Sequence, residues 1–574
     1  MLKLISLFNK TYSLVAALMI TIFLIYYYSL CPTVYLIDSG ELAAVSYTLG
    51  IAHPTGYPLY TLISYFFAHL PGEPIKNLNL LSALFTTVAA AFLYLTAKQI
   101  LRDKISPLLC ASLFAFSLTM WRTSVTNEVY PLAALFAILI IYSLFRLRND
   151  RGFYFIMYLI GLSLTNHIII FSLTIPVFCY LVFVYRPSLK KIMFGILCVL
   201  LGVSLYLYLI TRTFGGAELG WGNTYNLNRL IWHVTGKQYQ VWMFTVSLRE
   251  TLNNLFNGFT MLLKDFLFIL IIPVFFGFYH LFRVERKHFW LLTSIFLLNL
   301  LYTINYPIPD IESYYIPGFI ALILILTYGL ALTKKYLKWF IVLPIAVIIP
   351  ILNYNQCTLK ENTFGLDFSE AHIEQLPQKS LLVCSYWDIY SPTIYLRKVK
   401  GIRRDLIIID KELLRRTWYI KYIEEEYPEF YQTVKDAVEA YLIELYKFEY
   451  DRPYESYTIQ LRFIRMLESF VDAKIDEGTY FAIPFPDHDL KQVYPYYYRI
   501  PRGLVFEIKT DSMNYIPFDF SKLMIKKPLI INDERLRYNI ELIKGMADSN
   551  YRYLNLTKRY SEAQQVKKWL THFE

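Results

Sequence analysis

The sequence predicts a polytopic α-helical membrane protein with a soluble α/β domain at its C-terminal end. Only 18% of the 574 residues are charged and 56% are hydrophobic, whereas a soluble domain carries about a quarter charged residues. The charges are unevenly spread, because residues 1–353 hold 24 of the 56 Lys and Arg and 12 of the 45 Asp and Glu. We therefore expect a transmembrane domain over 1–353 and a soluble domain over 354–574.

Eleven apolar runs are expected to form transmembrane helices. The first, near 12–30, is about 19 residues long and precedes no small-residue cleavage site, so we interpret it as an uncleaved helix. The others lie near 78–98, 107–121, 129–146, 153–165, 168–185, 192–211, 266–282, 289–305, 314–333 and 337–353.

The distribution of basic residues predicts the orientation. With a cytoplasmic N-terminus, 17 of the 24 Lys and Arg of residues 1–353 fall in inner loops, as the positive-inside rule requires. An odd number of spans then places the C-terminal domain on the outer side. Since the net charge of +11 arises in the membrane part, we expect these residues to anchor loops and no nucleic acid to bind.

The first outer loop contains the most informative local pattern. Asp38 is expected to cap a short helix in which Glu41 occupies the third position, and Gly50 to close it in the left-handed conformation. Pro58 is suited to begin a second helix. We expect both helices, at about 38–70, to lie on the outer surface. Helix capping alone would explain both acidic residues.

The C-terminal part has the pattern of alternating strands and helices. Short strands are expected at 380–385, 405–409, 479–483 and 503–508, with helices at 389–398 and over 533–571. Cys357 and Cys384 would be able to form a disulfide if this part lies outside the cytoplasm.

Several sequence blocks together resemble a known family. They are Asp38-Ser-Gly-Glu41, Gly50 to Tyr60 (which contains His53-Pro-Thr-Gly-Tyr57), Asn77 to Ala83, Glu128-Val-Tyr130, Gly161 to His167, Asp310 to Pro317, Tyr386 to Pro392, Gly401 to Asp405 and Trp418-Tyr419. In this order they resemble the multi-spanning family of transmembrane protein 260-like protein O-mannosyltransferases. The resemblance covers most of the chain, and residues 420–574 are the least covered.

The resemblance implies a GT-C type glycosyltransferase. Such an enzyme would move a sugar, mannose by the resemblance, from a polyprenyl-phosphate donor to a Ser or Thr hydroxyl of an exported protein, with inversion. The hydroxyl is a poor nucleophile and needs a carboxylate to take its proton. Asp38 is the expected base, with Glu41 as the second catalytic candidate.

Ten further residues are candidates for substrate binding. They are His53, Tyr57, Glu128, Asn166, His167, Asp310, Glu312, Arg122, Arg212 and Arg229. An arginine fork suits the donor phosphate, although each arginine would equally serve as an interfacial anchor. His53 would orient the acceptor or bind the phosphate, or else only stabilise its turn.

Asn166 and His167 would hold sugar hydroxyls or simply cap a helix. Glu128, Asp310 and Glu312 could join Asp38 around Mg²⁺ or Mn²⁺, yet we expect no cofactor and no metal requirement.

The expected partners are the lipid bilayer, a polyprenyl-phosphate-linked sugar and an exported protein acceptor. A multi-pass protein of the plasma membrane is favoured over one of the endoplasmic reticulum, because the C-terminal part contains one Asn-x-Ser/Thr sequon, at Asn555. The alternative function is a transporter or flippase of a lipid-linked or small polar substrate. That function usually places charges near the bilayer midplane and often involves inverted repeats.

Overall fold

The computed structural model describes residues 2–101, 103–308, 310–484, 488–511, 516–528 and 533–573. The chain divides into two compact units. Unit 1 comprises residues 1–32, 45–217 and 224–360, and unit 2 comprises residues 33–44, 218–223 and 361–574. Two short segments from the N-terminal half of the chain therefore belong to unit 2. The boundary at residues 44 and 45 falls inside helix α2 (Ser39–Thr48).

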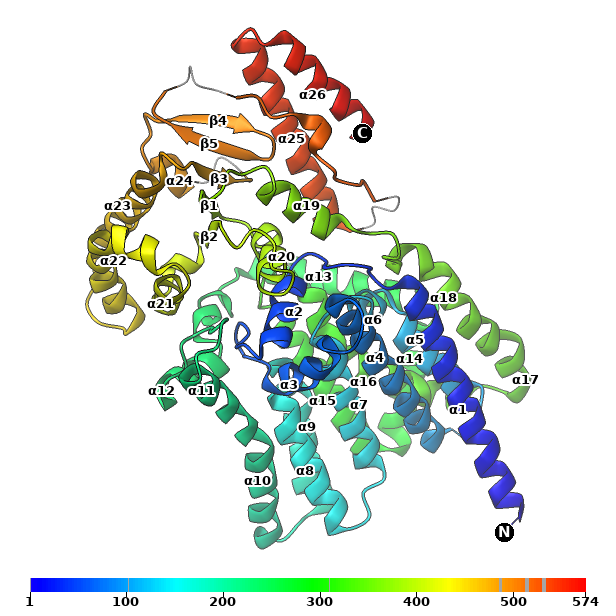
Figure 1. The fold of residues 1–574 in the computed structure, drawn as a ribbon. Coiled ribbons are helices and arrows are strands. Elements are labelled where there is room, and N and C mark those ends of the chain that lie inside the picture. The colour runs from blue at the N-terminus through cyan, green and yellow to red at the C-terminus, as the bar shows by residue number, and fades with distance from the viewer. Residues whose placement is uncertain are drawn as a thin grey trace. The chain divides into compact units, whose positions relative to one another are not determined.

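The regular secondary-structure elements of unit 1 are helices, joined by turns and loops, in the part of the chain that the structure describes. Its helices are α1 (Leu2–Ser29), α3 (Pro58–Ala68), α4 (Pro74–Ile100), α5 (Ser106–Phe116), α6 (Leu118–Ser124), α7 (Tyr130–Phe145), α8 (Asp150–Leu164), α9 (Phe171–Tyr180), α10 (Leu189–Val203), α11 (Leu207–Phe214), α12 (Leu227–Val234), α13 (Leu248–Asp265), α14 (Ile271–Val284), α15 (Arg286–Thr303), α16 (Ile316–Ala331), α17 (Lys335–Leu337) and α18 (Leu343–Cys357). Helices α4, α5, α7 and α16 pack against one another, and α16 also packs against α14 and α15 (Figure 1).

Six helical segments among the described residues are long and apolar enough to cross a membrane. They are Thr11–Ser29, Pro74–Ile100, Ile168–Tyr185, Leu189–Phe214, Ile311–Ala331 and Lys338–Cys357. The five other predicted spans coincide with α5, α7, α8, α14 and α15, which are shorter or less apolar. The protein is thus a multi-pass membrane protein, and the count of eleven spans stays a prediction.

Two of the shorter helices have a local cause for their length. The apolar run near 107–121 is broken at Ser117, whose hydroxyl accepts a hydrogen bond from the amide of Met120 (3.2 Å) and caps α6. The run near 266–282 begins with two residues in the left-handed conformation, Leu267 (φ 51°) and Phe268 (φ 57°), so α14 starts only at Ile271. Both interruptions shorten helices that hydropathy alone predicts to be longer.

Small residues and an apolar surface characterise the packing of unit 1. A Cβ on Gly277 of α14 would overlap with the carbonyl oxygen of Ile325 in α16, so only glycine permits this close helix crossing.

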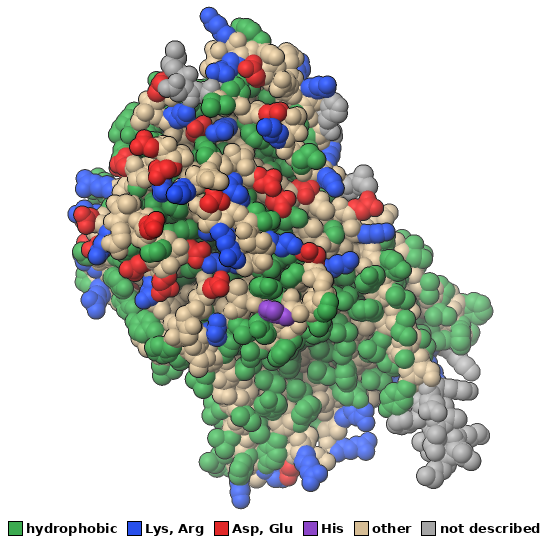
Figure 2. All heavy atoms as spheres, in the orientation of Figure 1, with side chains coloured by type: hydrophobic (Ala, Val, Ile, Leu, Met, Phe, Trp, Pro, Cys, Tyr) green, Lys and Arg blue, Asp and Glu red, His purple; other side chains and the backbone are tan. Residues whose placement is uncertain are grey.

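Many large apolar side chains of unit 1 are exposed, Phe194 and Leu201 of α10 among them. Figure 2 shows hydrophobic side chains covering much of unit 1 on the face in view, with Lys and Arg gathered at the lower helix ends. This is the surface expected of a helix bundle in lipid.

Unit 2 contains a five-stranded sheet in the described part of the chain. The strands are β1 (Leu381–Cys384), β2 (Ile407–Asp410), β3 (Thr479–Ala482), β4 (Tyr498–Arg502) and β5 (Val505–Lys509), in the spatial order β2-β1-β3-β5-β4. Strand β1 pairs in parallel with β2 and β3, whereas β5 is antiparallel to β3 and β4. The strands predicted near 380, 405, 479 and 503 are confirmed.

Helices surround this sheet within unit 2. They are α19 (Phe364–Ile373), α20 (Trp387–Lys398), α21 (Thr417–Glu426), α22 (Pro428–Glu449), α23 (Ser456–Lys474), α24 (His488–Gln492), α25 (Glu534–Leu556) and α26 (Tyr560–Phe573). Helix α20 connects β1 to β2 and confirms the helix predicted at 389–398. Helices α25 and α26 form the predicted C-terminal helical region and pack beside the β4–β5 hairpin (Figure 1). Cys357 in unit 1 and Cys384 in unit 2 are both buried free thiols.

Candidate active site

Helix α2 and the turn after it carry the predicted catalytic residues. Asp38 immediately precedes α2, and its carbonyl oxygen accepts the amide of Leu42 (2.8 Å), which is the first helical hydrogen bond. The helix ends at Thr48, and the left-handed residue is Leu49 (φ 52°), so the prediction that Gly50 takes this conformation was wrong. Pro58 begins α3 as predicted.

The carboxylates of Asp38 and Glu41 lie in different environments. Asp38 is partly exposed, and its Oδ1 accepts a hydrogen bond of 2.7 Å from the indole nitrogen of Trp387 in α20. Glu41 is fully buried, with 0% of its surface exposed. A base must reach a hydroxyl delivered by a substrate, and Asp38 meets this requirement better than Glu41.

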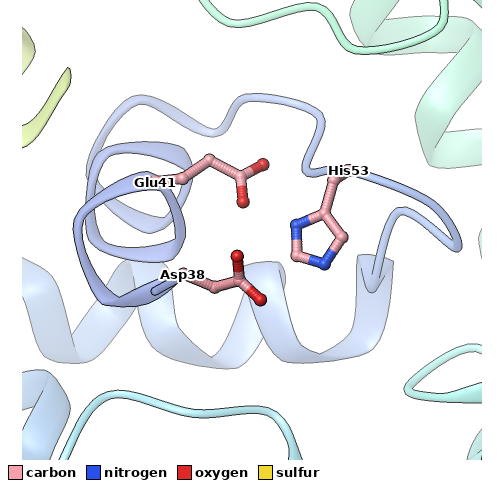
Figure 3. A group of neighbouring side chains, drawn as sticks. All are labelled: Asp38, Glu41 and His53. Carbon is pink, nitrogen blue, oxygen red and sulfur yellow. The ribbon is translucent and has the colours of Figure 1, made fainter. Parts of the chain in front are cut away.

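Residues 38–53 bring a third titratable side chain to these carboxylates. One ligand atom from each of Asp38, Glu41 and His53 lies within 4.8 Å of the others. Figure 3 shows both carboxylates directed toward the imidazole, which turns one ring nitrogen toward them. Two carboxylates and an imidazole could hold a divalent cation. This group contains Asp38 but not Glu128, Asp310 or Glu312, the residues that the sequence suggested as its co-ligands.

The neighbouring turn orients His53. Its Nε2 lies 2.9 Å from the hydroxyl of Tyr57, and that hydroxyl donates to the carbonyl oxygen of Pro54 (3.0 Å). Because the tyrosine has one proton to donate, the Nε2 of His53 is assigned as the donor in this pair. This pair uses only the Nε2 nitrogen of the ring. The predicted role of His53 as a turn residue and its predicted role at the substrate are therefore compatible.

His167 lies in an aromatic cluster in unit 1. Its ring stacks on Tyr57 (centroids 5.6 Å apart, planes at 6°) and also contacts Tyr130 (5.2 Å) and Tyr314 (5.3 Å). Its Nδ1 accepts the amide of Ile169 (3.1 Å). Burial lowers the pKa of His167 to about 3, with a smaller contribution from His53. The imidazole is therefore neutral at physiological pH and caps a helical turn, which is one of the two predicted roles.

The other predicted polar residues of unit 1 have specific partners. Asn166 donates to the carbonyl oxygen of Val129 (3.1 Å), and its buried Oδ1 has no hydrogen-bond partner among the described residues. Asp310 accepts the hydroxyl of Tyr130 (2.8 Å). The amide of Glu128 donates to Ser82 (3.2 Å), and the side chain of Glu128 is partly exposed.

The three predicted arginines differ in their contacts. Arg122 lies 3.9 Å from Glu312 in an exposed ion pair. Arg212 donates to the carbonyl oxygens of Leu49 (2.7 Å) and Thr48 (3.5 Å), and so stabilises the C-terminal end of α2. Its role is therefore structural in this conformation.

Arg229 combines burial with aromatic contacts. It is 6% exposed, and its guanidinium lies 5.0 Å from the ring centroid of Trp232. The ammonium of Lys237 approaches the same ring to 3.9 Å. The ring of Trp232 thus makes cation–π contacts with both Arg229 and Lys237. Of the three predicted arginines, Arg229 is the best candidate for binding the phosphate, because it is buried and a second cation lies on the same ring.

Sequence reasoning missed several residues at this site. Trp387, Asp388 and Ser391 hold the segment that carries Asp38, and His233 donates from Nε2 to the carbonyl oxygen of Ala52 (3.0 Å). Burial lowers the pKa of His233 to about 3, so it too is neutral. The block Tyr386 to Pro392 stood out in the sequence, but nothing local indicated its partner.

Comparison with known proteins identifies the class of enzyme. The family model described as Protein O-mannosyl-transferase TMEM260 N-terminal domain matches residues 38–191, beginning at Asp38. The chain is 23% identical over 589 residues to the Protein O-mannosyl-transferase tmem260 of Dictyostelium discoideum, covering 90% of this chain and 69% of that protein. It is also 23% identical over 443 residues to the Mus musculus Protein O-mannosyl-transferase TMEM260, covering 68% and 61% respectively. These matches support a glycosyltransferase of the GT-C type that is similar to the TMEM260 proteins.

The fold of this chain is similar to that of a solved structure. The crystal structure of ArnT from Cupriavidus metallidurans bound to undecaprenyl phosphate superposes with a TM-score of 0.51 at 12% sequence identity. The match covers 70% of this chain and 91% of that one. The resemblance predicted from the sequence blocks is therefore confirmed at the level of fold and enzyme class.

Proposed function

We propose that this enzyme transfers mannose from a polyprenyl-phosphate donor to a Ser or Thr hydroxyl of an exported protein. The names of the two curated relatives support the sugar and the protein acceptor. The polyprenyl carrier is supported by the fold shared with ArnT, which was crystallised with undecaprenyl phosphate.

The observation that carries the proposal is the state of Asp38. Its carboxylate is partly exposed, and its Oδ1 accepts a hydrogen bond of 2.7 Å from the indole of Trp387. In the proposed step Asp38 takes the proton of the acceptor hydroxyl as that oxygen bonds to the anomeric carbon. The bond from this carbon to the phosphate oxygen breaks with inversion, and polyprenyl phosphate leaves as an anion.

The leaving phosphate needs positive charge more than it needs an acid. Arg229 and Lys237, both on Trp232, are proposed to receive it. Asn166, with its buried Oδ1, is proposed to accept a hydroxyl of the donor sugar. We propose no requirement for a metal, because a phosphate ester departs as a stable anion and Asp38 can act as base without one.

The proposed site faces the outside of the plasma membrane, with the N-terminus in the cytoplasm. Exported acceptors are present on that side. The endoplasmic reticulum membrane is the alternative location, and its lumen is the equivalent compartment. Protease protection of the C-terminal unit in sealed vesicles of known orientation tests whether this unit lies on the side opposite to the cytoplasm, in either membrane.

The test is sugar transfer in detergent from radiolabelled polyprenyl-phosphate mannose to a Ser/Thr-containing acceptor. Wild type, Asp38→Asn and wild type with EDTA are compared. We expect label released by β-elimination from wild type with or without EDTA, and none from Asp38→Asn. Full transfer by Asp38→Asn would overturn the role of Asp38, and loss of transfer with EDTA would overturn metal independence.

A further inference from the structure

The segment before and at the start of α2 contacts α20 at four of its five residues 37–41, within unit 2. The amide of Ile37 donates to Asp388 (3.0 Å), and Oδ1 of Asp38 accepts from Trp387 (2.7 Å). A Cβ on Gly40 would overlap with the carbonyl oxygen of Ser391. The amide of Glu41 donates to the Ser391 hydroxyl (3.1 Å).

Two of these contacts go beyond ordinary helix capping. Ile37 has φ of 60°, a conformation that costs a β-branched residue energy unless neighbouring groups hold it. Gly40 lies so close to α20 that no other residue would fit without displacing backbone. The blocks Asp38-Ser-Gly-Glu41 and Tyr386 to Pro392 are therefore complementary in shape and in hydrogen bonding. Asp38 and Trp387, which form one of the hydrogen bonds between them, are 349 residues apart in the sequence.

The anchor of this contact is a buried charge network. Asp388 is 0% exposed and accepts hydrogen bonds from Nε of Arg535 (2.7 Å), Nδ2 of Asn539 (2.9 Å) and the hydroxyl of Tyr386 (3.0 Å), in addition to Ile37. With these donors the buried carboxylate is compensated in charge and in hydrogen bonding. A rigid acceptor of this kind fixes the backbone of Ile37, and hence the orientation of the next residue, Asp38.

The indole of Trp387 is itself confined by aromatic neighbours. It packs edge-on against Trp221 (centroids 6.0 Å apart) and contacts Tyr390 (5.8 Å). Trp221, from the other short segment of unit 2, in turn contacts Trp418 at 4.4 Å. Large rings packed on one another leave the indole few alternative rotamers. Its N–H is therefore aimed at Asp38 before any substrate binds.

We propose that Trp387 is a positioning residue for the proposed base, and that unit 2 thereby supplies part of the reaction geometry. The inference rests on the proposed function of Asp38. The indole engages Oδ1 and so restricts rotation of the carboxylate that is proposed to take the acceptor proton.

The experiment compares Trp387→Phe with Trp569→Phe in the full chain. Phenylalanine keeps the aromatic packing but removes the N–H. Trp569 in α26 is a matched control, since its ring packs on Phe520 and Phe573. We expect Trp387→Phe to lower kcat about 10- to 100-fold with KM of the donor unchanged, because a misoriented carboxylate takes the proton less efficiently.

Each outcome bears on the proposal. A kcat for Trp387→Phe within twofold of wild type would overturn it. A loss of kcat equal to that of Trp569→Phe would do the same, because both losses would then reflect a smaller fraction of folded enzyme. Asp38→Asn distinguishes failure of this inference from failure of the proposed function. If Asp38→Asn is inactive while Trp387→Phe is unimpaired, only the positioning role of Trp387 fails. Full activity of Asp38→Asn would instead show that Asp38 is not the base.

Discussion

The surroundings of Asp38 in unit 2 and those of His167 in unit 1 are built on different physical principles. Asp38 belongs to a network of charges and hydrogen bonds, in which Asp388 and Arg535 hold the backbone next to it. His167 lies among tyrosine rings, and burial keeps it neutral. The difference teaches that Asp38 is oriented by hydrogen bonds and charges within unit 2, whereas His167 is held neutral by burial among rings of unit 1.

The largest effect on stability is expected from breaking the charge network. Arg535→Met would leave Asp388 buried without its cation, which destabilises a protein by about 3–5 kcal/mol. We expect unit 2 to become sensitive to protease and to melt at lower temperature. Arg552→Met on the same helix α25 is the control, because the pair of Arg552 with Asp548 is exposed and worth little. Equal melting of the two variants would contradict the assigned role of the network.

Next in size is the effect of removing the buried cation from unit 1. Arg229→Gln is expected to raise the KM for the polyprenyl-phosphate donor about tenfold or more, because the donor phosphate loses a charged partner. Arg249→Gln in the exposed first turn of α13 is the matched control. An unchanged KM in Arg229→Gln, measured on folded protein, would remove Arg229 from the proposed phosphate site.

A smaller effect is expected from the neutral histidines. The pKa values of His167 and His233 are lowered to about 3, so between pH 6.5 and 3 the unfolded chain binds more protons than the folded one. Stability should therefore fall as the pH decreases below about 6.5, the unperturbed pKa of histidine, and stay level above it.

The double variant His167→Asn, His233→Gln tests this dependence. It should show a smaller drop in melting temperature between pH 7 and pH 4 than wild type, whereas the exposed His69→Gln should keep the wild-type drop. Identical pH dependence of the double variant and wild type would show that these two side chains are not what makes the fold sensitive to acid.

Local sequence signals predicted much of the fold. Continuous apolar residues identified the strand Leu381–Cys384, and Pro58 identified the start of α3. They failed where a contact decides the outcome. Leu49, not Gly50, takes the left-handed conformation, and its carbonyl oxygen accepts from Arg212, 163 residues away in the sequence. Hydropathy does not reveal such a partner.

The candidate site shows the same limit. Asp38, Glu41 and His53 were identified because they lie in one short block, and the structure brings their side chains together. Trp387 was not given a role, because an indole donor has no local pattern that distinguishes it from a core aromatic. Only the fold of unit 2 places it 2.7 Å from Asp38.

The most direct test of the central claim is the rate of a single turnover with donor prebound to Asp38→Asn. The substitution keeps the size of the side chain and removes its basicity, and general-base catalysis contributes about 10²- to 10⁴-fold. We expect unchanged donor binding and a transfer rate at least about 100-fold below wild type. Transfer within a few-fold of the wild-type rate would contradict the account, because another group would then have to take the proton.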